Sequence, residues 1–482
     1  MAQTFLITGA TSGIGLALAR QFHQDSAGYR LVLVGRRSRL ELDDSLFTDT
    51  NYCQADLAAP DAAERVDAWC EKHGIETVDV AINNAGVGWT GPLWEQPADS
   101  ICDLVNVNLI APIAVTQALL PRVQRVSGTM VYISSVMSTV ASPDMAVYSA
   151  TKKALDGFVR SLRAEHSTGG VRFQVVHPGA TNTAMPGKVG IPASESNKWP
   201  SAESVAADII EGLDSGARHR AIGRSNKVLR SVSRRLPRLV AAAAGRRNRS
   251  PLTLLAAGSV PRVLITGAAD GIGRALAVRY AEDGYQVLGV DIDVDRANQT
   301  AALAADGRIQ FRILDLATSD MGWVVGLEPF DVIVHNAGTS AVGPFASIEA
   351  EAYRQVVAIN LLAPMLLTRE LLATNKINDG ARIVLLSSLS HQLGYPGAAV
   401  YAATKDGLEM YGRALAVAIP DVSVTTVFPG PTRTAHAARY SPDNSNESRR
   451  MDPADLADAI VDTRRARLVP GSAAKGLSLI HI

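Results

Sequence analysis

The sequence predicts an α/β protein with two doubly wound parallel sheets, one in each half of the chain. The chain has 482 residues, which is more than the roughly 250 to 300 that one hydrophobic core supports. One set of short motifs occurs twice, in the same order and at an almost constant offset. Within each copy, short apolar runs that are typical of buried strands alternate with longer helical stretches.

Seven motifs carry the repeat. TGATSGIG from Thr8 returns as TGAADGIG from Thr266, ADLA from Ala55 as LDLA from Leu314, NNAG from Asn83 as HNAG from His335, VNLIAP from Val107 as INLLAP from Ile359, ISS from Ile133 as LSS from Leu386, YSATK from Tyr148 as YAATK from Tyr401, and HPGATNT from His177 as FPGPTRT from Phe428. Chance matches would not keep one order and spacing, so the chain is two copies of one domain.

Each copy contains apolar runs without polar alternation, as expected of strands that are covered on both faces. They are residues 5–7, 30–34, 78–82, 129–133 and 173–176 in the first copy, and residues 262–265, 286–290, 331–334, 382–386 and 422–428 in the second. The expected fold is two doubly wound parallel-sheet (Rossmann-type) domains in tandem.

The expected boundaries are a first domain at residues 1–245, a linker at 246–260 and a second domain at 261–482. Residues 218–249 carry eleven Lys or Arg and no Asp or Glu. We interpret this basic segment as a solvated C-terminal helix of the first domain, with contact to a membrane surface or an acidic partner as the alternative. The final LSLIHI resembles a translated sequencing adapter, so we expect these residues not to be native and the second domain to be truncated, with its native sequence after about Gly476 left open.

The composition favours small-molecule chemistry. The chain has 47 Lys and Arg and 47 Asp and Glu, so its formal net charge is zero. It therefore has no overall positive potential that would favour nucleic acid as a partner. Cys53, Cys70 and Cys102 match neither a zinc site nor a redox pair, and we predict no metal site. The sequence indicates no secretion signal and no apolar stretch of ~18 residues, so a cytoplasmic location is expected.

Two motifs suggest chemistry. A glycine-rich turn between a strand and a helix lets the backbone approach a pyrophosphate at the positive end of the helix dipole. Tyr148 and Lys152, like Tyr401 and Lys405, are four residues apart and share a helix face. An ammonium beside a phenol stabilises the phenolate, which lowers its pKa towards the range of a general acid or base. A serine lies thirteen residues before each tyrosine.

Together these motifs resemble the short-chain dehydrogenases/reductases, and the resemblance covers nearly the whole chain. It implies that a tyrosine in each half is the catalytic acid/base and that the lysine contacts the nicotinamide ribose. It also implies a serine that positions the substrate oxygen and an asparagine that holds a water of a proton relay. The implied catalytic residues are Asn108, Ser135, Tyr148 and Lys152 in the first half, and Asn360, Ser388, Tyr401 and Lys405 in the second.

The resemblance also implies cofactor-binding residues in both halves. In the first half they are Gly9, Ser12, Gly13, Ile14, Gly15, Arg36, Arg37, Asp56, Leu57, Asn84, Ala85, Gly86, Pro178, Gly179 and Thr183. In the second they are Gly267, Asp270, Gly271, Ile272, Gly273, Asp291, Asp315, Leu316, Asn336, Ala337, Gly338, Pro429, Gly430 and Thr434. Thr183 and Thr434 could instead be turn residues. His335 departs from the asparagine usual in the family, and we expect a local adjustment there without loss of the cofactor.

The two halves are expected to prefer different cofactors. Gly35 aligns with Asp291, and the arginines Arg36 and Arg37 follow the glycine. A carboxylate there accepts hydrogen bonds from the ribose hydroxyls of NAD and repels a 2′-phosphate, whereas arginine attracts that phosphate. Asp270 adds a second negative charge in the second half. We therefore expect NADP(H) in the first half and NAD(H) in the second.

The resulting hypothesis is a bifunctional oxidoreductase that interconverts ketones and secondary alcohols. The alternatives are one catalytic half with a nicotinamide-binding scaffold or sensor, or a redox-coupled epimerase. The segment with His391 and Gln392 differs from Ser138 and Thr139 in the first copy, so the substrate pockets are expected to differ. Family members pair through the tyrosine-bearing helices, which implies an intrachain pseudo-dimer or a homo-oligomer.

Overall fold

The structure, a computed structural model, describes residues 2–213, 217–223, 259–304, 306–390, 394–440, 450–463 and 465–470, with residues 226, 229, 232–233 and 252–253 between the halves. Most of the basic segment and of the predicted linker lies outside the described residues. So do His391, Gln392 and the final LSLIHI.

The first half contains a parallel sheet of seven strands in the order β3-β2-β1-β4-β5-β6-β7. The strands are β1 (Thr4–Thr8), β2 (Arg30–Gly35), β3 (Tyr52–Gln54), β4 (Val80–Asn83), β5 (Thr129–Ile133), β6 (Arg172–His177) and β7 (His219–Ala221). The five predicted strands are confirmed within one or two residues. The short edge strands β3 and β7 were not predicted, because three residues give no clear hydrophobic pattern.

The second half repeats this order as β10-β9-β8-β11-β12-β13-β14. Its strands are β8 (Arg262–Thr266), β9 (Gln286–Asp291), β10 (Ile309–Ile313), β11 (Phe330–His335), β12 (Ile377–Leu386), β13 (Ser423–Val427) and β14 (Arg467–Leu468). The prediction of two doubly wound parallel sheets in tandem is confirmed. In both sheets the order reverses between the first and fourth strands, where ligands bind in folds of this kind.

Helices cover both faces of each sheet. The first half has α1 (Gly13–Gln24), α2 (Ala62–Lys72), α3 (Ala98–Val105), α4 (Ala111–Gln124), α5 (Ala146–Glu165), α6 (Ala184–Lys188), α7 (Ala193–Ser196) and α8 (Ala202–Leu213). The second has α11 (Gly271–Glu282), α12 (Val294–Ala301), α13 (Ala350–Val357), α14 (Ala363–Ala373), α16 (Ala399–Ala418), α17 (Ala435–Tyr440) and α18 (Pro453–Asp462). Successive strand residues point to opposite faces. Leu6 therefore packs towards α2, α4 and α5, whereas Phe5 and Ile7 pack towards α1 and α8.

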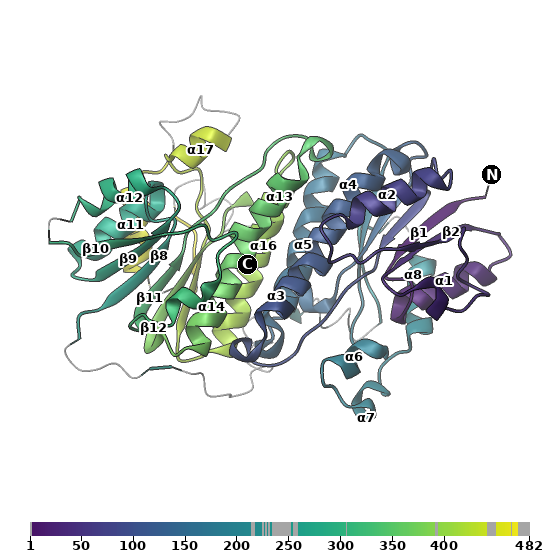
Figure 1. The fold of residues 1–482 in the computed structure, drawn as a ribbon, viewed down its shortest axis with the longest axis horizontal. Coiled ribbons are helices and arrows are strands. Elements are labelled where there is room, and N and C mark those ends of the chain that lie inside the picture. The colour runs from purple at the N-terminus through teal and green to yellow at the C-terminus, as the bar shows by residue number, and fades with distance from the viewer. Residues whose placement is uncertain are drawn as a thin grey trace.

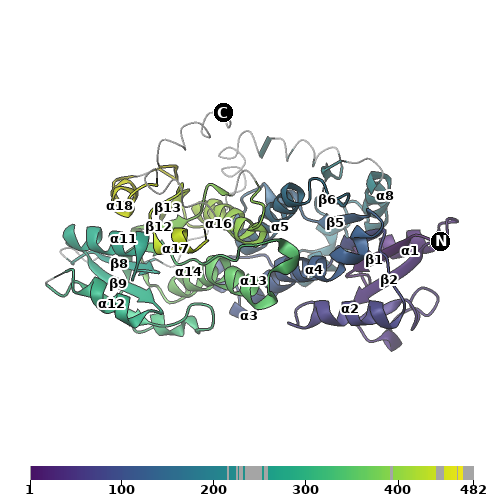
Figure 2. The ribbon, with the colours of Figure 1, turned by 90° about the horizontal axis from the view of Figure 1, so that it is seen from above.

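The halves meet through α5 and α16, which lie side by side between the two sheets in both views (Figures 1 and 2). One hydrophobic core runs through this contact, from Leu6 in the first sheet to Leu264 in the second. Asp406 of α16 is buried in the interface and pairs with Arg160 of α5. Gly157 leaves the room for it, since a Cβ there would lie 2.0 Å from Asp406 Oδ2.

Two helical stretches, Ala98–Gln124 and Ala350–Ala373, are long and apolar enough to span a membrane by length and composition. The expectation that the chain has no such stretch is wrong. Both stretches are largely buried inside the fold, 78% and 61% of their most apolar windows, as core helices are. Each contains a π-helical turn, η3 (Asn106–Ile110) or η8 (Ala358–Leu362), that joins two α-helices.

Candidate active sites

The glycine-rich turns lie against the loops that follow β4 and β11. Gly9 and Gly267 adopt φ values of +66° and +65°, and a Cβ on either would come within 2.8 Å of the Cα of Ala85 or Ala337. Asn84 Nδ2 donates to Thr8 O at 3.0 Å, and Asn336 repeats this bond to Thr266. The predicted glycine and Asn-Ala-Gly residues are therefore brought together in both halves.

Tyr148 and Lys152 lie on one face of α5, beside the end of β5. The Ser135 hydroxyl lies close enough to the Tyr148 phenol to oppose the rise in its pKa. Lys152 Nζ donates to Ile133 O at 3.0 Å and lies 5.9 Å from the Tyr148 ring centroid. The three predicted side chains thus converge at the carboxyl end of β5.

The second half repeats this arrangement. The Ser388 hydroxyl lies close enough to the Tyr401 phenol to oppose the rise in its pKa. Lys405 Nζ donates to Leu386 O at 2.9 Å and lies 5.5 Å from the Tyr401 ring centroid. The same chemical groups therefore occupy the same places on α16 and β12.

Burial controls the titration of these groups. It raises the pKa of the Tyr148 and Tyr401 phenols, although the serine hydroxyls act in the opposite direction. It lowers the pKa of Lys152 and Lys405 to about 8. The expectation that the lysines lower the phenol pKa values is wrong for this arrangement, because desolvation outweighs charge and each Nζ faces a backbone carbonyl.

Asn108 and Asn360 lie within the π-turns, a distortion that is frequent at functional sites. The side chain of Asn108 bonds to Val87 N at 2.9 Å and to Val87 O at 3.0 Å. Asn360 makes the matching bonds to Thr339 at 2.8 and 2.9 Å. Both side chains thus hold the strand-to-helix loop, and the predicted water-holding role stays a prediction. A Cβ on Gly86 would lie 3.2 Å from Asn108 Oδ1 and 3.4 Å from Lys152 Nζ, so these groups are neighbours.

A cavity of about 710 Å³ in the second half joins the predicted cofactor residues to Tyr401. It is lined at one end by Asp291 and Asp315 and at the other by Ser388, Tyr401 and Lys405. Its remaining predicted lining residues are Gly267, Asp270, Gly271, Ile272, Leu316, Asn336, Ala337, Gly338, Pro429, Gly430 and Thr434. The volume of this cavity and its lining by the glycine turn at the start of α11 fit a dinucleotide.

Sequence reasoning expects a substrate loop at roughly residues 433–450 but, apart from Thr434, singles out none of the residues there that line this cavity. His436 and Tyr440 of α17 lie beside Tyr401, with ring centroids 6.3 Å apart for His436 and Tyr401 and 4.9 Å for His436 and Tyr440. Burial, together with Lys405 and Arg439, lowers the pKa of His436 to about 4, so the imidazole is neutral near pH 7. The position in the first half that matches His436 is Met185, which lies against Gly88. No local motif marks either residue, because α6 and α17 vary in sequence.

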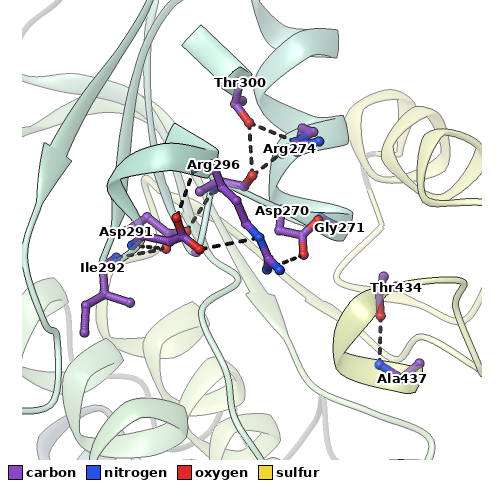
Figure 3. Close-up of polar contacts among 12 residues, drawn as sticks. Asp270, Gly271, Arg274, Asp291, Ile292, Arg296, Thr300, Thr434 and Ala437 are labelled. Atoms are coloured by element: carbon purple, nitrogen blue, oxygen red, sulfur yellow. Dashed lines mark hydrogen bonds and ion pairs between the residues drawn. The ribbon is translucent and has the colours of Figure 1, made fainter. Parts of the chain in front are cut away.

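The adenosine end of the second half is crowded with charge (Figure 3). Asp291 Oδ2 accepts from Ala269 N at 2.9 Å, and its Oδ1 accepts from Ile292 N at 2.8 Å. Arg296 of α12 reaches across to Asp270, with Nη1 2.9 Å from Oδ2, and also pairs with Asp293. Sequence reasoning missed Arg296, which offsets the charge of Asp270.

The adenosine end of the first half is simpler. Arg36 and Arg37 are exposed after β2. Their backbone carbonyls accept hydrogen bonds from Gln54 Nε2 at 3.4 Å and from the Tyr52 hydroxyl at 2.7 Å, respectively. Asp56 is exposed and accepts from Ala58 N at 3.1 Å, whereas Leu57 is buried. Ser12 precedes α1 without a side-chain capping bond.

The remaining predicted residues lie around the loops that follow β6 and β13. Thr183 caps α6 and Thr434 begins α17, and both methyl groups lie near the second glycine of the turns, Gly13 and Gly271. Gly179 of the first half lies directly against Asn226, since a Cβ there would be 2.1 Å from Asn226 Nδ2. The turn-residue and cofactor interpretations of the threonines therefore remain compatible.

His335 ends β11 and is buried. Its Nε2 lies 2.9 Å from Thr368 Oγ1, and burial lowers its pKa to about 3, so the ring is neutral. The local adjustment is this single bond to α14, while Asn336 keeps its bonds to the glycine turn.

A family model described as short chain dehydrogenase matches residues 3–192 and 261–445. The chain belongs to the short-chain dehydrogenase family. Both copies of the repeat carry the match, so the tandem arrangement of two such domains is confirmed. Members of this family are oxidoreductases.

Curated short-chain dehydrogenases match part of the chain. The rat dehydrogenase/reductase SDR family member 7B is 34% identical over 197 residues, which are 37% of this chain and 58% of that protein. The bovine protein of the same name is 34% identical over 231 residues, 43% of this chain and 69% of that protein. The chain thus spans only about three fifths of the length of several relatives it matches.

Two solved structures resemble the whole chain. The C-domain of a bacterial malonyl-CoA reductase, solved with NADP, has a TM-score of 0.67 at 15% identity and covers 97% of this chain and 98% of that one. The N-domain of such an enzyme, also solved with NADP, has a TM-score of 0.66 at 16% identity and covers 98% of both chains. At this identity the likeness concerns the fold, including the placement of two sheets around one interface.

Proposed function

We propose that the chain is a bifunctional NAD(P)-dependent oxidoreductase that interconverts carbonyl and secondary alcohol groups of small molecules at two sites. The observation that carries this proposal is the repeated convergence of serine, tyrosine and lysine at the ends of β5 and β12. A protein that only bound a nucleotide would have no chemical use for a phenol beside a serine hydroxyl and a buried lysine in both halves.

The residues present fit a nicotinamide dinucleotide. The glycine turns lie at the N-termini of α1 and α11, where the helix dipole and the first backbone N–H groups favour a pyrophosphate. When bound, the dinucleotide supplies or accepts the hydride. Lys152 and Lys405 lie where they can bond to its ribose, and the buried pocket keeps water from competing for these bonds.

The tyrosines handle the proton. Burial keeps the Tyr148 and Tyr401 phenols protonated near pH 7, so each can donate its proton to the oxygen of a carbonyl substrate. Ser135 and Ser388 lie beside the phenols and can bond to the same substrate oxygen. In the direction of oxidation the phenols must first lose a proton, which makes that direction faster at high pH.

We further propose that the first half uses NADP(H) and the second half NAD(H). Support comes from the exposed guanidinium groups of Arg36 and Arg37 in the first half and from the carboxylate of Asp291 in the second. Arg296 is engaged by Asp270 and Asp293 and so is not directed at a 2′-phosphate. Both malonyl-CoA reductase structures contain NADP, so NADP(H) in both halves is the competing outcome.

One catalytic half beside a nicotinamide-binding scaffold is a second candidate. The position of Asn226 directly against Gly179 favours it, because this side chain occupies space where the loop of the first half would close over a nicotinamide. A redox-coupled epimerase would require both sites to act on one substrate.

The test combines two variants with both cofactors. The panel is cyclohexanone, acetophenone, diacetyl and their alcohols, each assayed with NADPH, NADH or the oxidised forms. Tyr148→Phe is expected to lower one activity by roughly 100- to 10,000-fold and leave the other, and Tyr401→Phe the reverse.

Loss of both activities in one variant, or of neither, would contradict two independent sites. Loss of activity only in Tyr401→Phe would favour the scaffold. The same cofactor preference in both variants would exclude the split. Fluorescence titration of the cofactor serves as the control, since a phenol hydroxyl contributes little to dinucleotide binding.

A further inference from the structure

The last turn of α5 in the first half binds the backbone of the second half. Glu165 Oε1 accepts from Phe345 N at 2.6 Å, and Oε2 accepts from Gly397 N at 3.0 Å. Ser161 lies one turn earlier on α5, and its Oγ accepts from Tyr395 N at 3.1 Å. Two side chains of one half thus satisfy three backbone N–H groups of the other.

These N–H groups belong to two segments that wall the cavity around Tyr401. Phe345 begins η7 (Phe345–Ser347), directly after a loop in which Thr339, Ser340 and Val342 line the cavity. Tyr395 lines the cavity itself, and Gly397 precedes the first residue of α16 by two positions. The carboxylate of Glu165 therefore ties one wall of the cavity to the other.

The environment of the Glu165 carboxylate strengthens the two hydrogen bonds that it accepts. The Glu165 side chain is only 14% exposed, and hydrogen bonds to an ionised group are shorter and stronger than neutral ones. Its charge lies at the N-terminus of α16, where the helix dipole stabilises an anion. Gln117 of α4 adds bonds from Nε2 to Phe345 O at 3.1 Å and to Ile348 O at 2.7 Å. The first half thus engages both the donor and the acceptor of Phe345.

The carboxylate contact has no counterpart in the opposite direction, although Arg413 of α16 donates from Nη2 to Thr139 O of the first half at 3.4 Å. The residues of α16 that match Ser161 and Glu165 are Ala414 and Ala418, which carry no acceptor. Gln117 does have a working counterpart, Arg369, whose Nε donates to Gln96 O at 3.0 Å. The pseudo-symmetric interface therefore shares one contact type, while the carboxylate clamp acts only on the second site.

We propose that Glu165, aided by Ser161, is a positioning residue for the second active site, so that the first half forms part of the support of the substrate pocket around Tyr401. The proposal rests on the proposed function of the second half. Glu165 touches neither substrate nor cofactor, and it acts through the loops that carry Val342 and Tyr395.

The experiment uses the full chain with Tyr148→Phe, so that turnover reports the second site alone. The substrate is the panel compound with the highest turnover that Tyr401→Phe abolishes. Glu165→Ala is expected to lower kcat/KM by roughly 10- to 100-fold, mainly through KM, because misplaced walls weaken substrate positioning. The kcat/KM of Glu165→Gln is expected to lie between those of Glu165→Ala and the unsubstituted residue, since the amide oxygen can still accept one of the two bonds. Ser161→Ala should give a smaller rise in KM.

Two controls separate positioning from general damage. Glu71→Ala removes an exposed carboxylate from the last turn of α2 and should change nothing. In the Tyr401→Phe chain, Glu165→Ala should leave the KM of the first site unchanged. Hydrogen–deuterium exchange of the full chain should quicken in peptides covering residues 339–348 and 394–401.

Unchanged KM and unchanged exchange in Glu165→Ala would overturn the proposal, as would equal rises of KM at both sites. If no turnover depends on Tyr401, the proposed function of the second half fails, and the exchange measurement alone then decides whether Glu165 orders these loops. Should Glu165→Ala unfold, judged by circular dichroism, Glu165→Gln and Ser161→Ala carry the same test.

Discussion

Behind the two serines the halves are built differently. In the first half, His177 is fully buried, with Nδ1 3.2 Å from Ser135 O and Nε2 3.3 Å from His219 Nδ1. Ser138 Oγ donates to Asp156 Oδ2 at 2.7 Å, next to the same imidazole. A connected polar network therefore supports the strand end that carries Ser135.

In the second half, Phe428 replaces His177 and Arg467 replaces His219. The Arg467 guanidinium lies 4.6 Å from the Phe428 ring centroid, which is a cation–π contact. Ser388 still meets Tyr401 as Ser135 meets Tyr148. The comparison teaches that the parallel sheet sets the position of the serine, and that either polar or aromatic packing can fill the space behind it. The polar version is more fragile, because each member depends on its partners.

The largest effect on stability is expected from Asp156→Ala. The substitution leaves Ser138 and His177 buried without their carboxylate, which should lower the free energy of unfolding by about 3 to 5 kcal/mol. Urea unfolding measures this change. Glu71→Ala, which removes an exposed carboxylate from α2, is the control and should cost less than about 1 kcal/mol. Equal losses in both variants would mean that the network adds no specific stability.

The interface acid should give a pH-dependent effect. Burial raises the pKa of Asp406 to about 6. Because this folded value lies above the ordinary 3.8, the stabilisation by the proton is complete below about pH 4 and is lost as the pH rises through about 6. Asparagine stays neutral at every pH. As the pH rises from about 4 to 7, the free energy of unfolding of Asp406→Asn should therefore rise by about 3 kcal/mol relative to that of the unsubstituted chain.

Chemical unfolding across this range tests the gain. Asp103→Asn removes an exposed carboxylate and is the control. Parallel pH profiles for Asp406→Asn and the unsubstituted chain would show that the carboxyl titrates normally in the interface.

A smaller effect is expected where the adenosine ends differ. Asp270→Ser places the serine of the first half, Ser12, into the second half and releases Arg296 from the closer of its two carboxylate partners, while Asp293 remains. The partly freed guanidinium should attract a 2′-phosphate, so that the preference for NADP(H) over NAD(H) rises about tenfold at the Tyr401 site. The measurement is the ratio of kcat/KM values in the Tyr148→Phe chain. Arg296→Ala added to Asp270→Ser should cancel the rise, and an unchanged ratio would place Arg296 outside the cofactor site.

Local patterns predicted what depends on local physics. The glycine turns, the buried strands and the Tyr-Lys spacing could be predicted because backbone conformation, hydrophobic burial and helix periodicity leave short signatures. Contacts such as Arg296 with Asp270, or Glu165 with Phe345, join residues that no short pattern connects. The phenol pKa was misjudged for a related reason, since desolvation depends on the whole surroundings of Tyr148 and Tyr401 and not on one neighbouring lysine.

Gly157 shows that the two interface helices of one chain can change independently of each other, which the helices of two identical chains cannot do. On a twofold axis every substitution is made twice, so a new side chain must fit its own copy as well as its old neighbours. Here Gly157 faces Asp406, while the residue that matches Gly157 in the second half is Met410, a much larger side chain. Gene fusion thus allows complementary changes to accumulate on one helix at a time, and a paired surface can lose its self-complementarity without losing its partner.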